Sequence, residues 1–462
     1  MMKTINPDIF RESDIRGLVA TDLTLDFMEC IGKAIGTLLR KEGGRTLTLG
    51  QDVRPSSTDI LHAVMAGILS TGCDIIAIGM IPTPVAYFSE HHFNTDGGVI
   101  ITGSHNPSEF NGVKISIRKN SIYGKKIREL YRMIVQQDFI SGRGRVESRE
   151  VVESYIQNIC SKIHFSKPIR TVVDGGNGCF GLVGPELLRR LGIEPFELFC
   201  EPDGTFPNHH PDPTTVKNLK TLRANVIERK ADVGIGFDGD VDRIGVIDDK
   251  GDIIWGDYLL ILFARHVLNQ HPGASIIGDV KCSQNLFQDI KNRGGIPVMT
   301  ATGHSLIKKK MRETGALLAG EMSGHIFFSD DYYGYDDALY AACRLLQILS
   351  DSKQKLSELL VDLPKTFYTP EIRIECPDHE KFHIVEEIAR YFKSRFDVID
   401  IDGIRINFPD GWALIRASNT QPVLVLRIEA QTKERLDEFQ SLLNDRLMLF
   451  DCLTGTNIFF ED

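Results

Sequence analysis

The sequence predicts an α/β protein made of three similar mixed-sheet α/β domains and a C-terminal α+β domain around a central cleft. Three observations support this prediction. A unit of alternating strands and helices recurs three times, at a spacing on the order of a hundred residues. A polar loop follows the third strand of each unit, and ligands of open α/β sheets bind at strand ends. From about residue 364 the pattern changes to a hairpin between two helices.

The bulk composition indicates a soluble globular protein. Its 462 residues are 42% hydrophobic and 25% charged, which is enough for several cores. A net charge of -10 argues against an extended nucleic-acid surface. The sequence has neither an apolar run long enough for a bilayer nor a signal-peptide core at its start. Nine cysteines without a Cys-x-x-Cys pair predict reduced thiols in a cytoplasmic protein.

The first unit, domain I, is expected over residues 1–148. A charged loop at 10–17 precedes a helical pattern over Leu25–Lys41, and the expected strands follow at 46–49, 74–78, 98–102 and 113–117. The third strand runs into Thr-Gly-Ser-His-Asn-Pro at 102–107, where glycine and proline favour a special loop conformation. We hypothesise that Ser104 carries a phosphoryl group there. A polar turn between two buried strands is the alternative.

Domain II is expected over residues 149–252, with strands at 169–173, 195–199, 232–237 and 244–247. Its third strand ends on three alternate carboxylates, Asp238, Asp240 and Asp242. Adjacent anions repel one another unless a cation neutralises them, and hard oxygen ligands suit Mg²⁺. An EF-hand is excluded because Arg243 and Asp249 replace its glycine and its final glutamate. A solvated acidic turn is the alternative.

A glycine-rich loop at 176–181 also lies in domain II. It fits Gly-x-Gly-x-x-Gly between a strand and a helix, which is typical of dinucleotide sites, and Glu201 follows at about the ribose distance. The corresponding loops of the other two units lack the pattern. An NAD-dependent enzyme is therefore only a minor alternative.

Domain III is expected over residues 253–365, with strands at 274–278, 296–300, 316–319 and 326–329. Glu321, Ser323 and His325 alternate along the loop after its third strand. A carboxylate, a hydroxyl and an imidazole are groups that hydrogen-bond sugar hydroxyls. A turn closed by a salt bridge would explain this stretch equally well.

Domain IV is expected over residues 366–462. We predict strands at 371–375, 401–408, 412–416 and 422–429, and helices at 380–396 and 433–448. The loop after 412–416 offers a guanidinium, hydroxyls, an amide and consecutive backbone N–H groups, which suit a phosphate dianion. Its residues are Arg416, Ser418, Asn419 and Thr420. A polar hairpin loop is the alternative, and the tail at 451–462 supports no prediction.

Taken in order, the four loops resemble those of the α-D-phosphohexomutase superfamily, most closely its bacterial phosphomannomutase/phosphoglucomutase branch. Residues 102–107, 238–243, 320–325 and 416–422 match the phosphoserine, metal, sugar-specificity and phosphate-binding loops. The resemblance covers nearly the whole chain. It implies an intramolecular phosphotransferase that interconverts hexose 1-phosphate and hexose 6-phosphate of mannose, glucose or both. A phosphoserine and a bisphosphorylated sugar would be the intermediates, Mg²⁺ the cofactor and hexose 1,6-bisphosphate the activator.

The resemblance also implies a role for each site residue. Ser104 would be the phosphorylated serine and, with Asp238, Asp240 and Asp242, would hold the metal. Catalytic groups would further include Arg16, Lys114, Arg243 and His325. Substrate would contact Lys281, His304, Glu321, Ser323, Arg416, Ser418, Asn419 and Thr420. One departure is Ser13, where the family usually has tyrosine. Met322 resembles the mannose/glucose branch, because glucosamine mutases typically place glutamine there.

Several alternatives remain open. They are a phosphoglucosamine mutase, a metal-dependent sugar phosphatase or kinase, and a binding protein without catalysis. A kinase would need a nucleotide, yet the sequence contains no Walker-type loop. The expected partners are hexose phosphates, without nucleic acid or membrane, in a monomer or weak dimer. The preference between mannose and glucose is not predicted.

Overall fold

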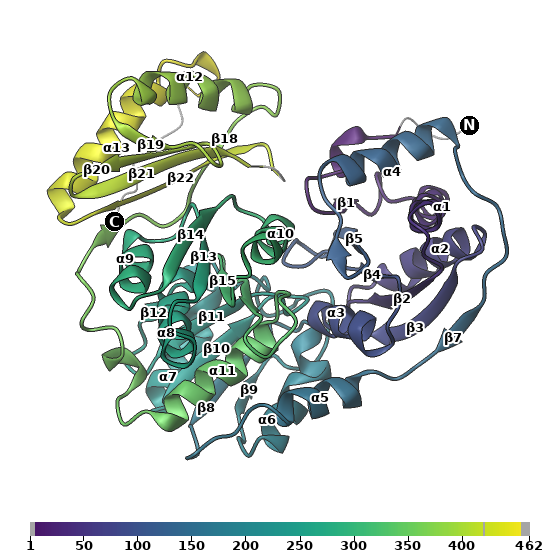
Figure 1. Ribbon diagram of the computed structural model, residues 1–462, viewed down its shortest axis with the longest axis horizontal. Helices are drawn as coiled ribbons and strands as arrows, with labels where there is room; N and C mark the ends of the chain where they lie inside the picture. The colour runs from purple at the N-terminus through teal and green to yellow at the C-terminus, as the bar shows by residue number, and fades with distance from the viewer. Residues whose placement is uncertain (1–4, 419–420, 454–462) are drawn as a thin grey trace.

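The computed structural model describes residues 5–418 and 421–453, and it has the predicted fold class. Three α/β units and one α+β unit follow one another along the chain (Figure 1). The domain limits at residues 148, 252 and 365 stay predictions, and the names domain I to domain IV are kept for these segments. In the described ranges, no helix is long and apolar enough to cross a membrane.

Domain I contains a mixed sheet with helices packed against it. Its strand order is β1 (Ile15–Leu18), β5 (Phe110–Ile117), β4 (Gly97–Ile101), β2 (Thr46–Gln51), β3 (Asp74–Met80) and β7 (Val146–Ser148), and β6 (Asn120–Ser121) pairs with β5. The helices are α1 (Leu25–Lys41), α2 (Ser57–Leu69), α3 (Thr83–His92) and α4 (Lys125–Gln136). Strands β2 and β4 are buried over almost their whole length, as expected of strands covered on both faces.

Domains II and III repeat this plan with smaller sheets. The domain II order is β12 (Ile253–Ile254), β11 (Ile244–Asp248), β10 (Val233–Phe237), β8 (Thr171–Asp174) and β9 (Phe196–Leu198), with α5 (Val152–Cys160), α6 (Gly184–Arg190) and α7 (Lys220–Arg229). Its edge strand, β12, comes from the first two residues of the segment named domain III. The domain III order is β14 (Ile296–Thr300), β13 (Ser275–Asp279), β15 (Leu318–Gly320) and β16 (Ile326–Phe328), with α8 (Gly256–Gln270), α9 (Gln284–Asn292), α10 (His304–Thr314) and α11 (Ala338–Asp351).

The strand pairings confirm the threefold repeat. In each unit the first strand pairs in parallel with the second and with the third, and the fourth runs antiparallel to the third. The third strands are β4, β10 and β15. Because each turns back into an antiparallel neighbour, the three polar loops leave their sheets at equivalent places.

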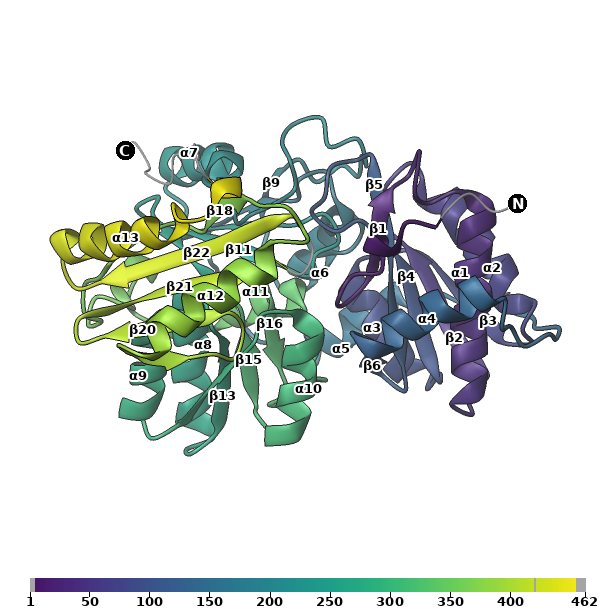
Figure 2. The ribbon, with the colours of Figure 1, turned by 90° about the horizontal axis from the view of Figure 1, so that it is seen from above.

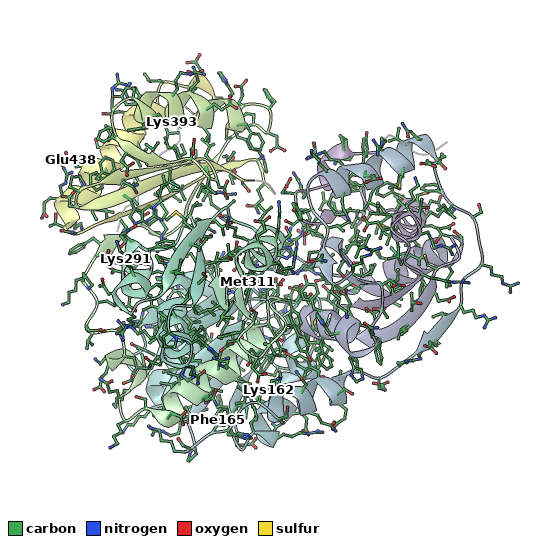
Figure 3. The ribbon with its side chains drawn as sticks, viewed as in Figure 1. Lys162, Phe165, Lys291, Met311, Lys393 and Glu438 are labelled. Carbon is green, nitrogen blue, oxygen red and sulfur yellow. The ribbon has the colours of Figure 1, made fainter. Side chains whose placement is uncertain are left out.

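Domain IV is a sheet with two helices on one face (Figure 1). Its strand order is β17 (Phe367–Tyr368), β22 (Val423–Ala430), β21 (Gly411–Ala417), β20 (Ile404–Phe408) and β19 (Asp397–Ile399), and β18 (Ile372–Glu375) also pairs with β22. The helices are α12 (Lys381–Lys393) and α13 (Lys433–Leu447). On the outer side of these helices, Lys393 and Glu438 extend into solvent (Figure 3).

The expected strand at 401–408 is too long at its start. Gly403 has a φ of 72°, and a Cβ at this position would lie 2.3 Å from the backbone oxygen of Ile415. The chain therefore turns at Gly403 before β20 begins, and a separate strand, β19, precedes the turn. In the tail, Leu453 is buried in the domain IV core, whereas 454–462 lie outside the described residues.

Alternate residues of β21 connect domain IV to domain III. Ala413 and Ile415 belong to the core under α12 and α13, whereas Trp412 and Leu414 pack on Val280 of domain III. Domains II and III share one large core, which also receives α3 of domain I. Seen from above, domain IV lies beside domain III and domain I stands at the opposite end (Figure 2).

Candidate active site

Ser104 lies at the end of β4 with its hydroxyl directed at domain II. Its Oγ donates to Asp238 Oδ2 at 2.9 Å and lies 3.2 Å from His105 Nδ1. The backbone of Ser104 has a φ of 49°, which is uncommon for a residue with a side chain and often marks a functional loop. Burial, followed by Arg243 and Arg16, lowers the pKa of His105 well below its usual range. His105 is therefore a neutral neighbour of the hydroxyl.

Arg54 holds the predicted phosphoserine loop, residues 102–107, in place. Its buried guanidinium donates to the backbone oxygens of Ser104, Asn106, Pro107 and Phe110 at 2.5–2.9 Å. Asp52 lies 3.2 Å from Arg54 Nε and accepts from the Gly103 N–H. Sequence reasoning missed Arg54, because its local setting resembles any charged loop before a helix. The structure shows that this side chain fixes where Ser104 points.

The acidic loop meets the serine loop backbone to backbone. A Cβ on Gly239 would lie 2.5 Å from the Ser104 carbonyl oxygen, so the loops pack this closely only around a glycine. Asp238 Oδ1 accepts from the backbone N–H groups of Asp242 and Arg243 at 3.0 and 3.1 Å. The acidic loop thus fixes one oxygen of Asp238 and leaves the other, Oδ2, to accept from Ser104.

Lys114, on the strand after Ser104, reaches two of these carboxylates. Its Nζ donates to Asp240 Oδ2 at 2.6 Å and to Asp242 Oδ2 at 2.5 Å. Burial favours the uncharged amine, but the two carboxylates outweigh it and raise the pKa of Lys114 well above its usual range. Burial opposes ionisation of Asp242 too, yet Lys114 holds its pKa at about 2. Burial and the neighbouring Asp242 raise the pKa of Asp238.

The donor set of the acidic loop fits a hard divalent cation. All three carboxylates are buried, and their oxygens lie within 4.8 Å of one another. Within the described part of the chain, Asp240 Oδ1 and Asp242 Oδ1 have no hydrogen-bond partner. Unpartnered buried carboxylate oxygens are costly, and carboxylate oxygens are the ligands that Mg²⁺ prefers. A solvated acidic turn, the alternative considered above, does not describe these buried side chains.

Arg243 links the acidic loop to the predicted sugar loop. Its Nε donates to His325 Nε2 at 2.9 Å. Glu321 lies between β15 and β16, where its Oε1 accepts from the Gly303 N–H at 2.6 Å and its Oε2 accepts from Ser323 Oγ at 3.2 Å. The structure therefore brings Glu321, Ser323 and His325 together beside domain II.

His304 and Lys281 lie around the same loop. His304 begins α10 and stacks on His325, with ring centroids 5.9 Å apart. Lys281 follows β13, and its Nζ donates to Glu371 Oε2 of domain IV at 3.0 Å. Burial favours the uncharged amine of Lys281, but Glu371 outweighs it and raises the pKa of Lys281.

The predicted phosphate loop is described only in part. Arg416 is buried, and its Nε donates to Asp402 Oδ2 at 2.9 Å. Asp402 Oδ2 also accepts from the Thr302 N–H of domain III at 3.1 Å. Ser418 Oγ accepts from the Gln421 N–H at 3.1 Å, so the hydroxyl closes the loop on itself. Asn419 and Thr420 lie outside the described residues.

Two residues of the N-terminal loop also reach the site. Arg16, on β1, donates to Asn106 Oδ1 at 2.8 Å and to Asp14 at 2.5 Å. Ser13 Oγ lies 2.6 Å from Ser305 Oγ, at the start of α10 in domain III. A small hydroxyl thus connects domains I and III where the related family usually has tyrosine.

Other parts of the protein occupy the space beside the glycine-rich loop at 176–181. A Cβ on Gly178 would lie 2.6 Å from the Gly239 oxygen, and one on Gly181 would lie 1.7 Å from the Cys200 oxygen. The Cys179 N–H donates to that same Gly239 oxygen at 2.9 Å. Close backbone packing against the acidic loop therefore explains these glycines, and the structure gives no support to the dinucleotide alternative.

Four profiles of one family match the chain in sequence. Their descriptions are phosphoglucomutase/phosphomannomutase α/β/α domain I at residues 7–140, domain II at 153–251, domain III at 255–367, and the C-terminal domain at 371–445. They follow the order in which the sheets and loops occur in the structure.

Individual relatives match over almost their whole length. The phosphomannomutase/phosphoglucomutase of Pseudomonas aeruginosa is 44% identical over 97% of both chains, and the phosphoglucomutase of Neisseria gonorrhoeae is 42% identical over 95% of this chain and 96% of its own. A crystal structure of a phosphoglucomutase/phosphomannomutase family protein from Burkholderia thailandensis has a TM-score of 0.91 and 41% identity, covering 98% of this chain and 99% of its own. With all four domains matched in order, the chain belongs to the phosphoglucomutase/phosphomannomutase family.

Proposed function

We propose that the protein interconverts the 1-phosphate and the 6-phosphate of mannose, glucose or both, through phospho-Ser104 and a bisphosphorylated sugar. One observation carries the proposal: the Ser104 hydroxyl of domain I donates to Asp238 in the buried acidic loop of domain II. A serine that carries a phosphoryl group needs cationic charge beside it. The acidic loop can supply this charge by binding a divalent cation. The relatives' names and the sugar-type loop at 320–325 support the same function.

The chemistry is two phosphoryl transfers in opposite directions. In the first, a free O1 or O6 hydroxyl of the hexose monophosphate attacks phosphorus, the bond from phosphorus to Ser104 Oγ breaks, and the hydroxyl loses its proton. In the second, after the sugar has turned over, Ser104 Oγ attacks the other phosphoryl group of the bisphosphate, the bond from phosphorus to the sugar oxygen breaks, and that oxygen takes up the proton. A hexose 1,6-bisphosphate from solution would prime Ser104 by the same second step.

Residues of the acidic loop would hold the cofactor. Asp238, Asp240 and Asp242, together with the phosphoserine, would bind Mg²⁺, which neutralises charge on a transferring phosphoryl group when bound. Arg243 and Arg16 supply guanidinium groups to that phosphoryl group. Two of the three protons of Lys114 are already donated to carboxylates, so Lys114 serves best as fixed positive charge. The proposal therefore assigns proton transfer to His325.

The remaining site residues would bind the sugar and its other phosphate. Glu321 and Ser323 would accept from and donate to two neighbouring sugar hydroxyls, with His304 beside them. Lys281 and the loop of Arg416, Ser418, Asn419 and Thr420 would hold the phosphate that is not reacting. Bound in this way, the sugar could present either end to Ser104.

A coupled assay primed with hexose bisphosphate tests the proposal. Mannose 1-phosphate and glucose 1-phosphate should both be tried, with glucosamine 1-phosphate as the arm for the alternative mutase and inorganic phosphate release as the arm for a phosphatase. Ser104→Ala should abolish turnover and remove the phosphorylated Ser104 peptide in mass spectrometry. Ser89→Ala is the matched control, because Ser89 is a buried serine on α3 whose hydroxyl donates to the Ala86 oxygen. Turnover by Ser104→Ala at the wild-type rate would refute the mechanism.

A further inference from the structure

Asp336, outside every loop discussed so far, lies against the ring of His325. It is fully buried in the segment between β16 and α11, and an antiparallel bridge with Phe327 pins its backbone. Its Oδ1 accepts from Lys308 Nζ at 2.9 Å, and Lys308 itself lies over the Tyr87 ring at 4.1 Å. The carboxylate is therefore anchored on one side and has its second oxygen, Oδ2, free to face the site.

That second oxygen faces the imidazole of His325. The distance from Asp336 Oδ2 to His325 Nδ1 is 3.2 Å, and Asp242 Oδ1 lies 3.6 Å from the same nitrogen. In the described ranges, neither His325 Nδ1 nor Asp336 Oδ2 makes a well-aligned hydrogen bond, and His304 Nδ1, the other buried nitrogen near Asp336 Oδ2, lies farther away, at 3.6 Å. The two atoms are thus each other's nearest available partners in a buried setting, where an unmade hydrogen bond is costly.

The opposite side of the ring fixes which nitrogen carries the proton. Arg243 Nε can only donate, and it points at His325 Nε2 at 2.9 Å. Nε2 must then present a lone pair, so the proton of the neutral ring belongs on Nδ1, facing Asp336. A carboxylate that accepts from one imidazole nitrogen commonly orients a ring whose other nitrogen takes part in catalysis or metal binding.

We propose that Asp336 is a positioning residue, which holds His325 with its proton on Nδ1 and its Nε2 lone pair directed at the reacting sugar hydroxyl. The inference rests on the proposed function. During transfer, Arg243 exchanges His325 for phosphoryl oxygens. The hydroxyl O–H bond then breaks as the O–P bond forms and the bond from phosphorus to Ser104 breaks. The proton goes to His325 Nε2, and the Nδ1 side of the resulting imidazolium faces the carboxylates of Asp336 and Asp242.

The sharpest test replaces Asp336 by its isostere. Asp336→Asn removes the anion but keeps the shape, and its amide can donate to Nδ1 and so reverse the tautomer. We expect kcat to fall about 10²–10⁴-fold, as when the carboxylate that orients a catalytic histidine is lost, with KM changed less than about threefold. Asp336→Glu should recover part of kcat. Asp337→Asn is the matched control, since Asp337 is an equally buried neighbour that binds the Tyr155 and Tyr332 hydroxyls.

A spectroscopic readout separates positioning from mere structure. Two-bond ¹H–¹⁵N spectra of protein labelled with ¹⁵N-histidine report which ring nitrogen is protonated, and the His325 signals are those lost in His325→Gln. Wild type and Asp337→Asn should show the proton on Nδ1, whereas Asp336→Asn should move it at least partly to Nε2. If Asp336→Asn fails to fold because it leaves the Lys308 ammonium unpaired, the pair Asp336→Asn with Lys308→Met removes that charge.

The outcomes distinguish this inference from the proposed function. Wild-type kcat in Asp336→Asn, or an unchanged His325 tautomer with lost activity, would overturn the positioning role. Wild type without mutase activity would refute the proposed function, and the NMR comparison would still decide whether Asp336 sets the tautomer.

Discussion

Lys114→Met removes the ammonium that donates to both Asp240 and Asp242. The side chains of this cluster are at most 5% exposed, so the two carboxylates would be left buried without the ammonium that pairs with them. Breaking a buried ion pair by removing one partner costs about 3–5 kcal/mol, because the remaining charge is uncompensated. The lysine belongs to domain I and the aspartates to domain II. We therefore expect the free energy of unfolding to fall by that amount in metal-free buffer.

Divalent cation should reverse much of this loss. In wild type the ammonium repels an incoming cation, and two unit charges about 4 Å apart interact by about 4 kcal/mol at an effective dielectric constant of 20. The variant removes this repulsion, so its unphosphorylated form should bind Mg²⁺ at least about tenfold more tightly, which is about 1.4 kcal/mol. Because the cation binds the folded state, saturating Mg²⁺ should raise the stability of the variant more than that of wild type.

Urea unfolding with EDTA and with saturating Mg²⁺, combined with calorimetric titration, measures both quantities. Lys41→Met is the control, since Lys41 and Asp138 form a solvent-exposed pair at 2.8 Å whose loss should cost less than about 1 kcal/mol. An equal Kd for Mg²⁺ in wild type and Lys114→Met, together with a stability loss below about 1 kcal/mol, would refute the reasoning. It would mean that Lys114 does not neutralise the acidic loop.

Two further predictions concern Glu90 and Gly239. Burial raises the pKa of Glu90 to about 7 although Ser116 donates to it, so the folded state binds this proton more tightly than the unfolded chain and loses stability as pH rises from about 4.5 to 7. The free energy of unfolding of Glu90→Gln, measured with urea, should therefore be about 3 kcal/mol higher than that of wild type at pH 8, but not at pH 4.5. The same pH dependence of this free energy in both proteins would contradict the prediction. Gly239→Ala places a Cβ 2.5 Å from the Ser104 oxygen, so kcat in the primed assay should fall at least about tenfold while α-helical circular dichroism is kept. Unchanged kcat would show that the two loops can separate freely.

The fold and three of the four loops could be predicted because their signals are local in sequence. Strands such as β4 and β10 are apolar runs buried on both faces, so each polar residue that ends them stands out. The structure confirms that the loops starting at Ser104, Asp238 and Glu321 occupy equivalent places. Domain IV was harder, because a single glycine, Gly403, decides where β20 begins.

The residues that sequence reasoning missed act through contacts between distant segments. Arg54 is an ordinary charged residue in the sequence, and only the fold places it among the carbonyl oxygens of a loop about fifty residues away. Asp336 lies in a tyrosine-rich segment and reaches Lys308 and His325 only after α10 packs beside β16. Ser13 differs from its family pattern in sequence, but its contact with Ser305 required coordinates. Supporting residues of this kind have no spacing that a pattern could reveal.

The charge balance at the site indicates that the acidic loop and Ser104 act together as one phosphoryl-binding site. Asp238, Asp240 and Asp242 carry three formal negative charges, and Lys114 supplies one positive charge, which leaves two negative charges in a buried volume. One divalent cation would balance these two negative charges. A second lysine could balance only one of them, and its side chain would occupy the space beside Ser104. A phosphoryl group on Ser104 then adds about two negative charges at the same place, and Arg243 and Arg16 lie close enough to the serine loop to lower the pKa of His105. Cationic charge is thus divided between groups that hold the acidic loop together and groups that remain for the phosphoryl group.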